Sequence, residues 1–186
     1  MSFLRRLACA LCACALMAPL ARAEGIVAAK SEIAFTMKQM GVRFDGRFRK
    51  WSGDIVFEPK SLATSKAVLD IDLGSIDLAS DDSDAEAKGP LWFDTAKYPT
   101  AHFASTAVRD AGGNRYEVAG KLTIKGITRD CVVPVSVTID AAGNRIAEGS
   151  FAIRRLDYRI GEGEWADTNT VANEIVVRVR IALAPA

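Results

Sequence analysis

Few side chains in this sequence could support catalysis. His102 is the single histidine, and we predict that it lies in a strand, where alternation gives the interior to Phe103 and the surface to His102. Cys131 shares a predicted strand face with Val133, where a thiol behaves as a small hydrophobic group. A nucleophilic cysteine needs an activating base, and a zinc site normally combines several ligands. The sequence therefore predicts no catalytic residue, no metal site, no cofactor, and a protein that is not an enzyme.

Acidic side chains gather in residues 80–88, and they are Asp81, Asp82, Asp84 and Glu86. A calcium-binding EF-hand loop has a different spacing, which includes a glycine and a distal Glu. Acidic residues in the first turn of a helix instead interact favourably with the positive end of the helix dipole. Because Ser80 can cap the N-terminus and Gly89 can end the segment, we predict a short helix in which these carboxylates have a structural role.

Residues 1–23 have the features of a secretory signal peptide. Arg5 and Arg6 precede an apolar run, and residues 21–23 form a small-x-small cleavage site. The apolar run, at about 11 residues, is shorter than the ~20 that a transmembrane helix needs. We therefore expect export to the periplasm, a mature domain of residues 24–186, and no integral membrane segment after cleavage. An uncleaved membrane anchor and a lipoprotein signal around residues 11–14 are the alternatives.

Removal of this leader changes the cysteine count and the charge. Three of the four cysteines would leave with it, so Cys131 would have no partner for an internal disulfide. Loss of Arg5, Arg6 and Arg22 would reduce the 24 basic residues to 21, against 23 acidic ones. Nucleic-acid-binding domains usually carry a basic patch or a strongly basic balance, so we predict no nucleic-acid partner. The sequence is compatible with transient membrane contact and with a homodimer.

From residue 31 onward, apolar and polar residues alternate with a period of two, which predicts strands with one buried face. The inward sets are Ile33, Phe35 and Met37; Ile55 and Phe57; Ala67, Leu69, Ile71 and Leu73; Val118, Leu122 and Ile124; Cys131, Val133, Val135, Val137 and Ile139; and Ile175, Val177, Val179 and Ile181. Turn-forming residues at 51–54, 110–114, 125–126 and 142–144 indicate hairpins between antiparallel neighbours. In the last set, Glu174, Arg178 and Arg180 alternate with the apolar residues, which predicts a polar outer face.

We predict an all-β fold, an antiparallel lipocalin-like barrel of about eight strands with one short helix; a β-sandwich is the alternative. A barrel of about eight strands either fills its interior with side chains or holds one small ligand. The inward positions carry hardly any charge, so a ligand inside would have to be apolar. The pattern itself leaves the filled barrel and the ligand-holding barrel open.

Short motifs occur in order along residues 26–184. They are FTMKQMGV at 35–42, DGRF at 45–48, GDIVF at 53–57, WFD at 92–94, KYP at 97–99, GKLTIKGIT at 120–128, IRRLDY at 153–158 and VANEI at 171–175. Together they resemble the YceI family of polyisoprenoid-binding proteins. Gln39 and Lys125 stand where that family often has histidine, and Arg159 stands where it commonly has glycine.

The resemblance implies a periplasmic lipid-binding protein that holds a polyisoprenoid or similar long apolar chain, quinone-like or prenyl, inside a barrel for sequestration or transport. The aromatic and aliphatic residues expected to bind this ligand are Phe35, Met37, Val42, Phe44, Phe48, Phe57, Leu69, Ile71, Trp92, Phe93, Phe103, Leu122, Ile124, Val135, Ile153, Trp165 and Val177. Arg155, Asp157 and Glu174 lie in or beside the motifs and either pair with one another at the rim or meet the ligand head group. The alternative function is a structural or stress-related interaction module with a filled barrel and no ligand.

Overall fold

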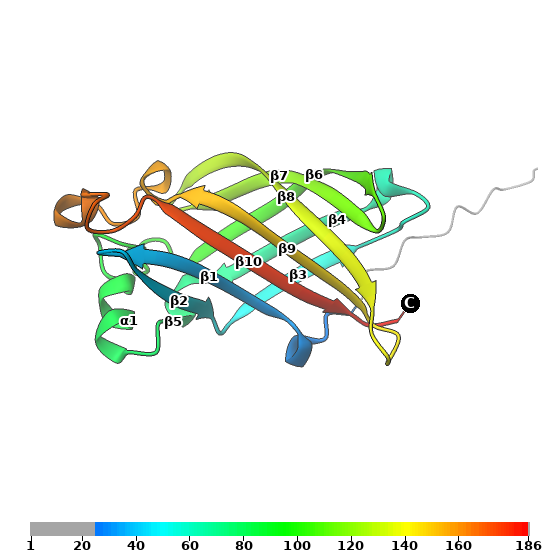
Figure 1. Ribbon diagram of the computed structural model, residues 1–186, viewed down its shortest axis with the longest axis horizontal. Helices are drawn as coiled ribbons and strands as arrows, with labels where there is room; N and C mark the ends of the chain where they lie inside the picture. Colours follow the sequence, from blue (N-terminus) through cyan, green and yellow to red (C-terminus); the bar gives the residue numbers. More distant parts are fainter. Residues whose placement is uncertain (1–24, 186) are drawn as a thin grey trace, which may run out of the picture.

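The computed structural model describes residues 25–185 of the 186-residue chain (Figure 1). The predicted signal peptide lies outside the described residues. Within them, ten strands form one antiparallel sheet in the order β3-β4-β6-β7-β8-β9-β10-β1-β2-β5. The predicted all-β antiparallel class with one α-helix is confirmed, and the sheet has ten strands where the pattern indicated about eight.

The elements follow one another along the chain in a simple order. The strands are β1 (Glu32–Gln39), β2 (Val42–Phe48), β3 (Trp51–Val56), β4 (Lys66–Asp72), β5 (Ile76–Asp77), β6 (Thr100–Gly112), β7 (Arg115–Ile124), β8 (Ile127–Ile139), β9 (Arg145–Arg154) and β10 (Glu174–Leu183). The helix is α1 (Asp81–Lys88), and 3-10 turns are formed by η1 (Ala28–Lys30), η2 (Leu62–Thr64), η3 (Leu73–Ser75), η4 (Arg155–Tyr158) and η5 (Gly163–Ala166). Within residues 25–185, no helix is long and apolar enough to cross a membrane.

The sheet curls around its apolar face, with β3 and β5 at its two edges (Figure 1). Glycines at two inward positions let aromatic rings lie flat across the strands. A Cβ atom at Gly46 would lie 2.4 Å from the ring of Phe35, and one at Gly120 would lie 2.5 Å from the ring of Phe103. Both rings therefore depend on a neighbouring strand without a side chain at the contact.

Helix α1 packs at the end of the sheet where β2 and β5 pair (Figure 1). Its N-cap is Ser80, whose hydroxyl accepts a hydrogen bond from the backbone N–H of Ser83, and its C-cap is Gly89. Ala87 is buried in a cluster with Phe35, Ile76 and Ile175. The helix predicted for residues 80–88 is thus confirmed, together with its capping residues.

One predicted turn is wrong. Residues 51–54 are the beginning of β3, where Trp51 pairs with Ile71 and Gly53 pairs with Leu69 on β4. Gly53 is there for close approach, because a Cβ atom would lie 2.6 Å from the Leu69 side chain. The other predicted turns do connect strands; at the β7–β8 turn, Lys125 and Gly126 both have positive φ angles, as a tight hairpin requires.

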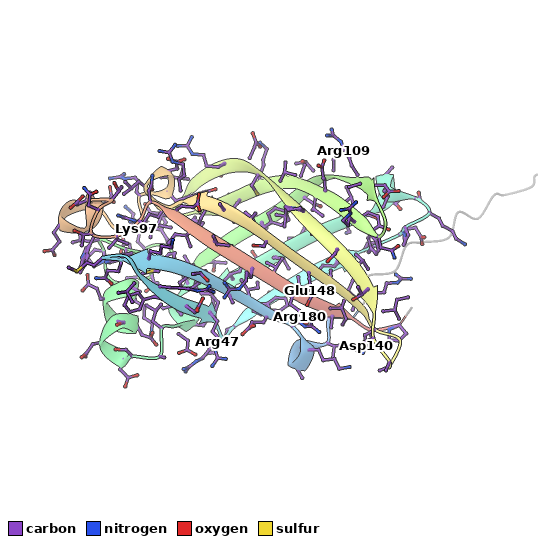
Figure 2. The ribbon with its side chains drawn as sticks, in the orientation of Figure 1. Arg47, Lys97, Arg109, Asp140, Glu148 and Arg180 are labelled. Atoms are coloured by element: carbon purple, nitrogen blue, oxygen red, sulfur yellow. The ribbon has the colours of Figure 1, made fainter. Side chains whose placement is uncertain are left out.

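Charged side chains occupy the outer surface, as the alternation in the last strand predicts. Glu148 on β9 and Arg180 on β10 form an ion pair there, and Figure 2 shows the two residues near each other. Asp45 on β2 accepts hydrogen bonds from Thr36, Arg43 and Arg178. These interactions, that with Thr36 first, lower the pKa of Asp45 to about 2.

Candidate ligand-binding cavity

The curled sheet encloses a cavity of about 550 Å³. Ordinary protein interiors have few voids larger than a water molecule, whereas pockets that bind small molecules occupy roughly 300–1,000 Å³. The wall is formed by side chains of the strands, of α1 and of the segments around η4 and η5, and most of them are apolar. A cavity of this size favours the ligand-holding barrel over the alternative of a barrel filled by its own side chains.

The structure brings all but one of the predicted ligand-binding residues to the wall of this cavity. Those that line it are Phe35, Met37, Phe44, Phe48, Phe57, Leu69, Ile71, Trp92, Phe93, Phe103, Leu122, Ile124, Val135, Ile153, Trp165 and Val177. The strand members share the inward face because alternate residues of a strand point to the same side. Trp92 and Phe93 reach the cavity from the segment between α1 and β6, and Trp165 reaches it from η5.

Val42 is the exception. It has the same parity in β2 as Phe44 and Phe48, but it pairs with Gln39 at the extreme end of the β1–β2 hairpin. Val42 is 59% exposed and does not contribute to the wall, although its partner Gln39 does. Phe44, the next residue on the same face of β2, lines the cavity while remaining 42% exposed.

Aromatic rings stiffen both ends of the cavity. Near α1, the ring of Phe48 lies 5.5 Å from that of Phe35 and 6.0 Å from that of Phe93. At the opposite end of the strands, Phe57 after β3 meets Tyr116 at the beginning of β7, with ring centroids 5.0 Å apart in an edge contact. Such tilted and edge arrangements are favourable for aromatic pairs, so the rings form well-defined end walls.

Two tryptophans form the wall beside α1, with ring centroids 5.6 Å apart. Trp165 Nε1 donates a hydrogen bond to Glu86 Oε1 at 3.0 Å. Trp92 is 8% exposed, and no described residue accepts a hydrogen bond from its Nε1. The two indole groups therefore differ: the N–H of Trp165 has a carboxylate partner, and the N–H of Trp92 is buried without a partner among the described residues.

Arg155 lies behind Trp92 and takes neither of the two roles that the sequence suggested for it. It is fully buried, and its guanidinium donates to the backbone carbonyls of Ala172, Ile160, Gly161, Trp165 and Val171, at 2.6–3.1 Å. Burial lowers its pKa. Arg155 does not pair with Asp157 or Glu174, and it is not part of the cavity wall, so both alternatives are wrong for it. Asp157 and Glu174 are themselves exposed.

Sequence reasoning missed several residues of the wall. Phe151 and Tyr116 lie on the inward faces of β9 and β7, and a stricter count of alternation in these strands could have found them. Ile160 belongs to a loop, and Glu86 belongs to α1. No period in the sequence marks these two, because their positions depend on how the loop and the helix pack against the sheet.

His102 and Cys131, the two side chains considered for catalysis, lie in different surroundings, one exposed and one packed against the core. His102 is exposed, as predicted, and its Nδ1 lies 2.7 Å from Asp70 Oδ1. Cys131 is half-buried against the core, and burial raises the pKa of its thiol. Among residues 25–185, no three His, Cys, Asp or Glu side chains are grouped so that they could hold a metal ion.

Comparison with known proteins gives one family model and several relatives. The model of the YceI-like domain matches residues 25–183. A UPF0312 protein of Vibrio cholerae is 34% identical over 106 residues, which are 56% of this chain and 56% of that protein. The chain therefore matches little more than half the length of such curated relatives.

Solved structures share the fold over more of the chain. BcnA of Burkholderia cenocepacia has 38% sequence identity and a TM-score of 0.82, over 85% of this chain and 99% of that one. A polyisoprenoid binding domain from Saccharophagus degradans, implicated in plant cell wall breakdown, has 18% identity and a TM-score of 0.71, over 88% of this chain and 99% of that one. At that identity the second likeness shows the fold alone.

Proposed function

This chain belongs to the YceI-like domain family, and from that membership we propose that it is a non-catalytic protein that binds a polyisoprenoid or a similar long apolar chain, prenyl or quinone-like. The observation that carries this proposal is the cavity of about 550 Å³ with an apolar wall. The polyisoprenoid binding domain of Saccharophagus degradans has the same fold, which supports the choice of ligand class.

The hydrophobic effect supplies the affinity in this proposal. Burial of apolar surface contributes about 25 cal/mol per Å² removed from water, and the ligand and the cavity wall are both desolvated on binding. The aromatic end walls are already packed in the protein, so little side-chain ordering opposes binding. The long apolar chain of the ligand would therefore provide affinity with few polar contacts.

Location and transport are further parts of the proposal. The leader-like residues 1–23 favour a periplasmic protein. There a lipid tail enclosed by a protein can cross an aqueous space that it could not cross alone. We propose that the protein sequesters or transports the lipid and needs no cofactor to do so. After cleavage of the leader it would have no membrane-embedded part. We further propose that it forms a homodimer and makes transient contact with the membrane.

The direct test is native mass spectrometry of the protein purified from its own cells, followed by organic extraction and identification of any released molecule. We expect a stoichiometric lipid with a long isoprenoid or similar chain. A protein that emerges free of lipid and does not change mass on incubation with prenyl lipids would contradict the proposal.

A matched pair of variants on β6 tests the cavity itself. Phe103 is buried in the wall, whereas Thr106 on the same strand is exposed. Phe103→Asp places a carboxylate among apolar groups, where an unpaired charge is costly, so we expect at least tenfold weaker lipid binding. Thr106→Asp introduces the same group on the surface and should bind lipid like the unmodified protein. Equal binding by both variants, each shown to be folded by circular dichroism, would contradict a ligand site inside the sheet.

A further inference from the structure

Exposed apolar side chains gather at the turn between β1 and β2. Among residues 25–185, five large hydrophobic residues are exposed, and three of them, Met40, Val42 and Phe44, lie within five residues of chain. Met40 is the most exposed of the five, at 78%. Single exposed hydrophobic residues are ordinary on protein surfaces, whereas clustered ones point to an interaction site. These three residues form the apolar tip of the β1–β2 hairpin.

Folding does not account for a methionine in this turn. Met40 and Gly41 have φ angles of +48° and +80°, the pattern of a type I′ hairpin turn, which prefers Asn or Asp followed by Gly. A methionine there has an unfavourable backbone angle and a side chain in water. The turn is nevertheless ordered, because the Met40 N–H donates to Thr170 O at 2.8 Å and the Ala172 N–H donates to Lys38 O at 2.9 Å. An apolar group is thus fixed in an exposed position that a polar residue would suit better.

The apolar tip borders an opening of the cavity. Phe44 lines the cavity and is exposed, and the same holds for Ser83 of α1. Since an exposed wall residue lies where the cavity meets solvent, the cavity opens between the β1–β2 hairpin and α1. Figure 1 shows this hairpin and α1 at the same end of the molecule. The tip therefore lies beside a route by which an apolar chain could enter.

The chemistry of the hairpin fits the surface of a phospholipid membrane. A stable protein interface uses about 20–30 residues a side, whereas shallow, reversible contact with acyl chains needs only a small apolar group. Lys38 and Arg43 pair in register beside the tip, where their long side chains can reach lipid phosphates while the tip lies deeper. Arg43 also contacts Asp45 at 3.2 Å, and α1 carries carboxylates across the opening. We therefore expect no requirement for anionic lipids.

We propose that the apolar tip inserts into the acyl layer of a phospholipid membrane and brings the cavity opening to the membrane surface. The ligand would then pass between bilayer and cavity with little of its apolar surface exposed to water, where that surface is unfavourable. This inference rests on the proposed lipid-binding function and gives the proposed membrane contact a definite surface.

The variant Met40→Asn tests the tip without harming the fold. It puts the preferred Asn-Gly pair in the type I′ turn, so the free energy of unfolding, measured with urea, should stay equal or rise. Association with sucrose-loaded vesicles of phosphatidylcholine and phosphatidylethanolamine is measured by sedimentation. It should fall about fivefold or more, because an apolar group no longer enters the acyl layer.

The matched control is Ile139→Asn. Ile139 is exposed as well, but it is the last residue of β8, and Figure 1 shows this end of β8 and α1 at opposite ends of the molecule. This variant should associate with vesicles like the unmodified protein. Equal association by both variants would overturn the inference. A dimer in solution that Met40→Asn dissociates, seen by analytical ultracentrifugation without vesicles, would assign the tip to a second copy of the chain and overturn it too.

Methyl nuclear magnetic resonance gives a readout on the unmodified protein. Met37 and Met40 are the methionines of residues 25–185; Met37 lines the cavity, and Met40 belongs to the tip. The protein carries ¹³C-methyl methionine, and phosphatidylcholine nanodiscs carry a nitroxide in their acyl chains. The Met40 signal, assigned by its loss in Met40→Asn, should broaden more than the Met37 signal. Broadening of Met37 alone, or of neither, would overturn the inference.

Ligand binding is measured separately, so that the inference and the proposed function can fail separately. Geranylgeraniol, a prenyl alcohol, should displace an apolar fluorescent dye from the unmodified protein and from Met40→Asn with equal affinity, since Met40 is not part of the cavity wall. Dye displacement without any vesicle association would overturn the membrane-inserting tip and leave lipid binding intact. If geranylgeraniol displaced no dye, the proposed function would fail, and the inference with it.

Discussion

At the scale of single residues, Arg155 and Trp92 are neighbours that differ in hydrogen bonding. Every donor group of the Arg155 guanidinium has a partner, whereas the Trp92 indole N–H has none among the described residues. The guanidinium of Arg155 donates to five backbone carbonyls from residues 160–172. These carbonyls belong to the loop that carries Trp165 and closes one end of the cavity. Arg155 therefore orders a segment that has little regular structure of its own, and it does so from outside the binding cavity.

Arg155→Lys should destabilise the protein strongly, although the positive charge is kept. A lysine has three donors on one atom and cannot reproduce the planar fork of a guanidinium, so two or more buried carbonyls would lose their partners. At roughly 1–3 kcal/mol for each unpaired group, we expect a loss of about 2–5 kcal/mol in the free energy of unfolding, measured with urea.

The neighbouring arginine is the control for this prediction. Arg154 is exposed at the end of β9, and Arg154→Lys should change the free energy of unfolding by less than about 0.5 kcal/mol. Similar losses for the two variants would mean that the carbonyl contacts of Arg155 contribute little.

Sequence reasoning worked best for residues inside strands. Alternation placed Phe35, Phe103 and Val177 on the cavity side and His102 on the outside. It could not place Arg155, because all the partners of its side chain are backbone carbonyls and leave no trace in the sequence. It also misplaced Val42, since parity gives the face of a strand and not how exposed a residue at its end is.

At the scale of elements, the β8–β9 turn shows how side chains hold two segments together. Asp140 Oδ1 accepts hydrogen bonds from the backbone N–H groups of Ala142 and Asn144, both at 2.9 Å. Its Oδ2 accepts from Asn144 Nδ2 at 2.8 Å and from Lys30 Nζ, at the end of η1, at 2.7 Å. Figure 2 places Asp140 at this turn. The hydrogen bond from the Asn144 side chain, followed by that from Lys30, holds the pKa of Asp140 well below its usual range.

This lowered pKa predicts a pH dependence of stability. A carboxyl whose pKa is lower in the folded state stabilises the protein above its ordinary pKa and loses that contribution as the pH falls through the folded value. The Asp140→Asn variant should therefore be less stable than the unmodified protein at neutral pH. The difference should shrink progressively below about pH 4. Urea unfolding of both proteins over a series of pH values measures it, and a difference that stays constant down to acidic pH would rule out the carboxylate as its source.

Elements were predictable where one physical signal dominated. Helix α1 has a cap, an acidic first turn and a glycine stop, and all three agree with its observed bounds. Gly53 was misread as part of a turn because a glycine in a strand and a glycine in a turn look alike until the partner strand is known. The two-residue strand β5 is too short to show any alternation.

At the scale of the whole molecule, the cavity depends on the curl of the sheet. The sequence predicted an apolar interior and left open whether side chains fill it. That outcome is set by the volume enclosed between strands far apart in the chain, such as β1 and β6, and no local pattern encodes this volume. Glycines that admit flat-lying rings, at residues 46 and 120, are a partial signal of it.

Filling the cavity from within should separate stability from ligand binding. Ala147 on β9 lines the cavity and pairs with Val137 and Ile181. In Ala147→Phe, a benzyl group would occupy space that the apolar wall leaves free, and cavity-filling substitutions commonly add about 0.5–2 kcal/mol to the free energy of unfolding. The same group would exclude a lipid chain, so we expect equal or higher stability together with at least tenfold weaker binding of prenyl probes. Ala152→Phe makes the same change at an exposed position of β9 and should leave binding unaltered. If Ala147→Phe bound these probes as well as the unmodified protein does, the lipid would have to occupy some other part of the molecule.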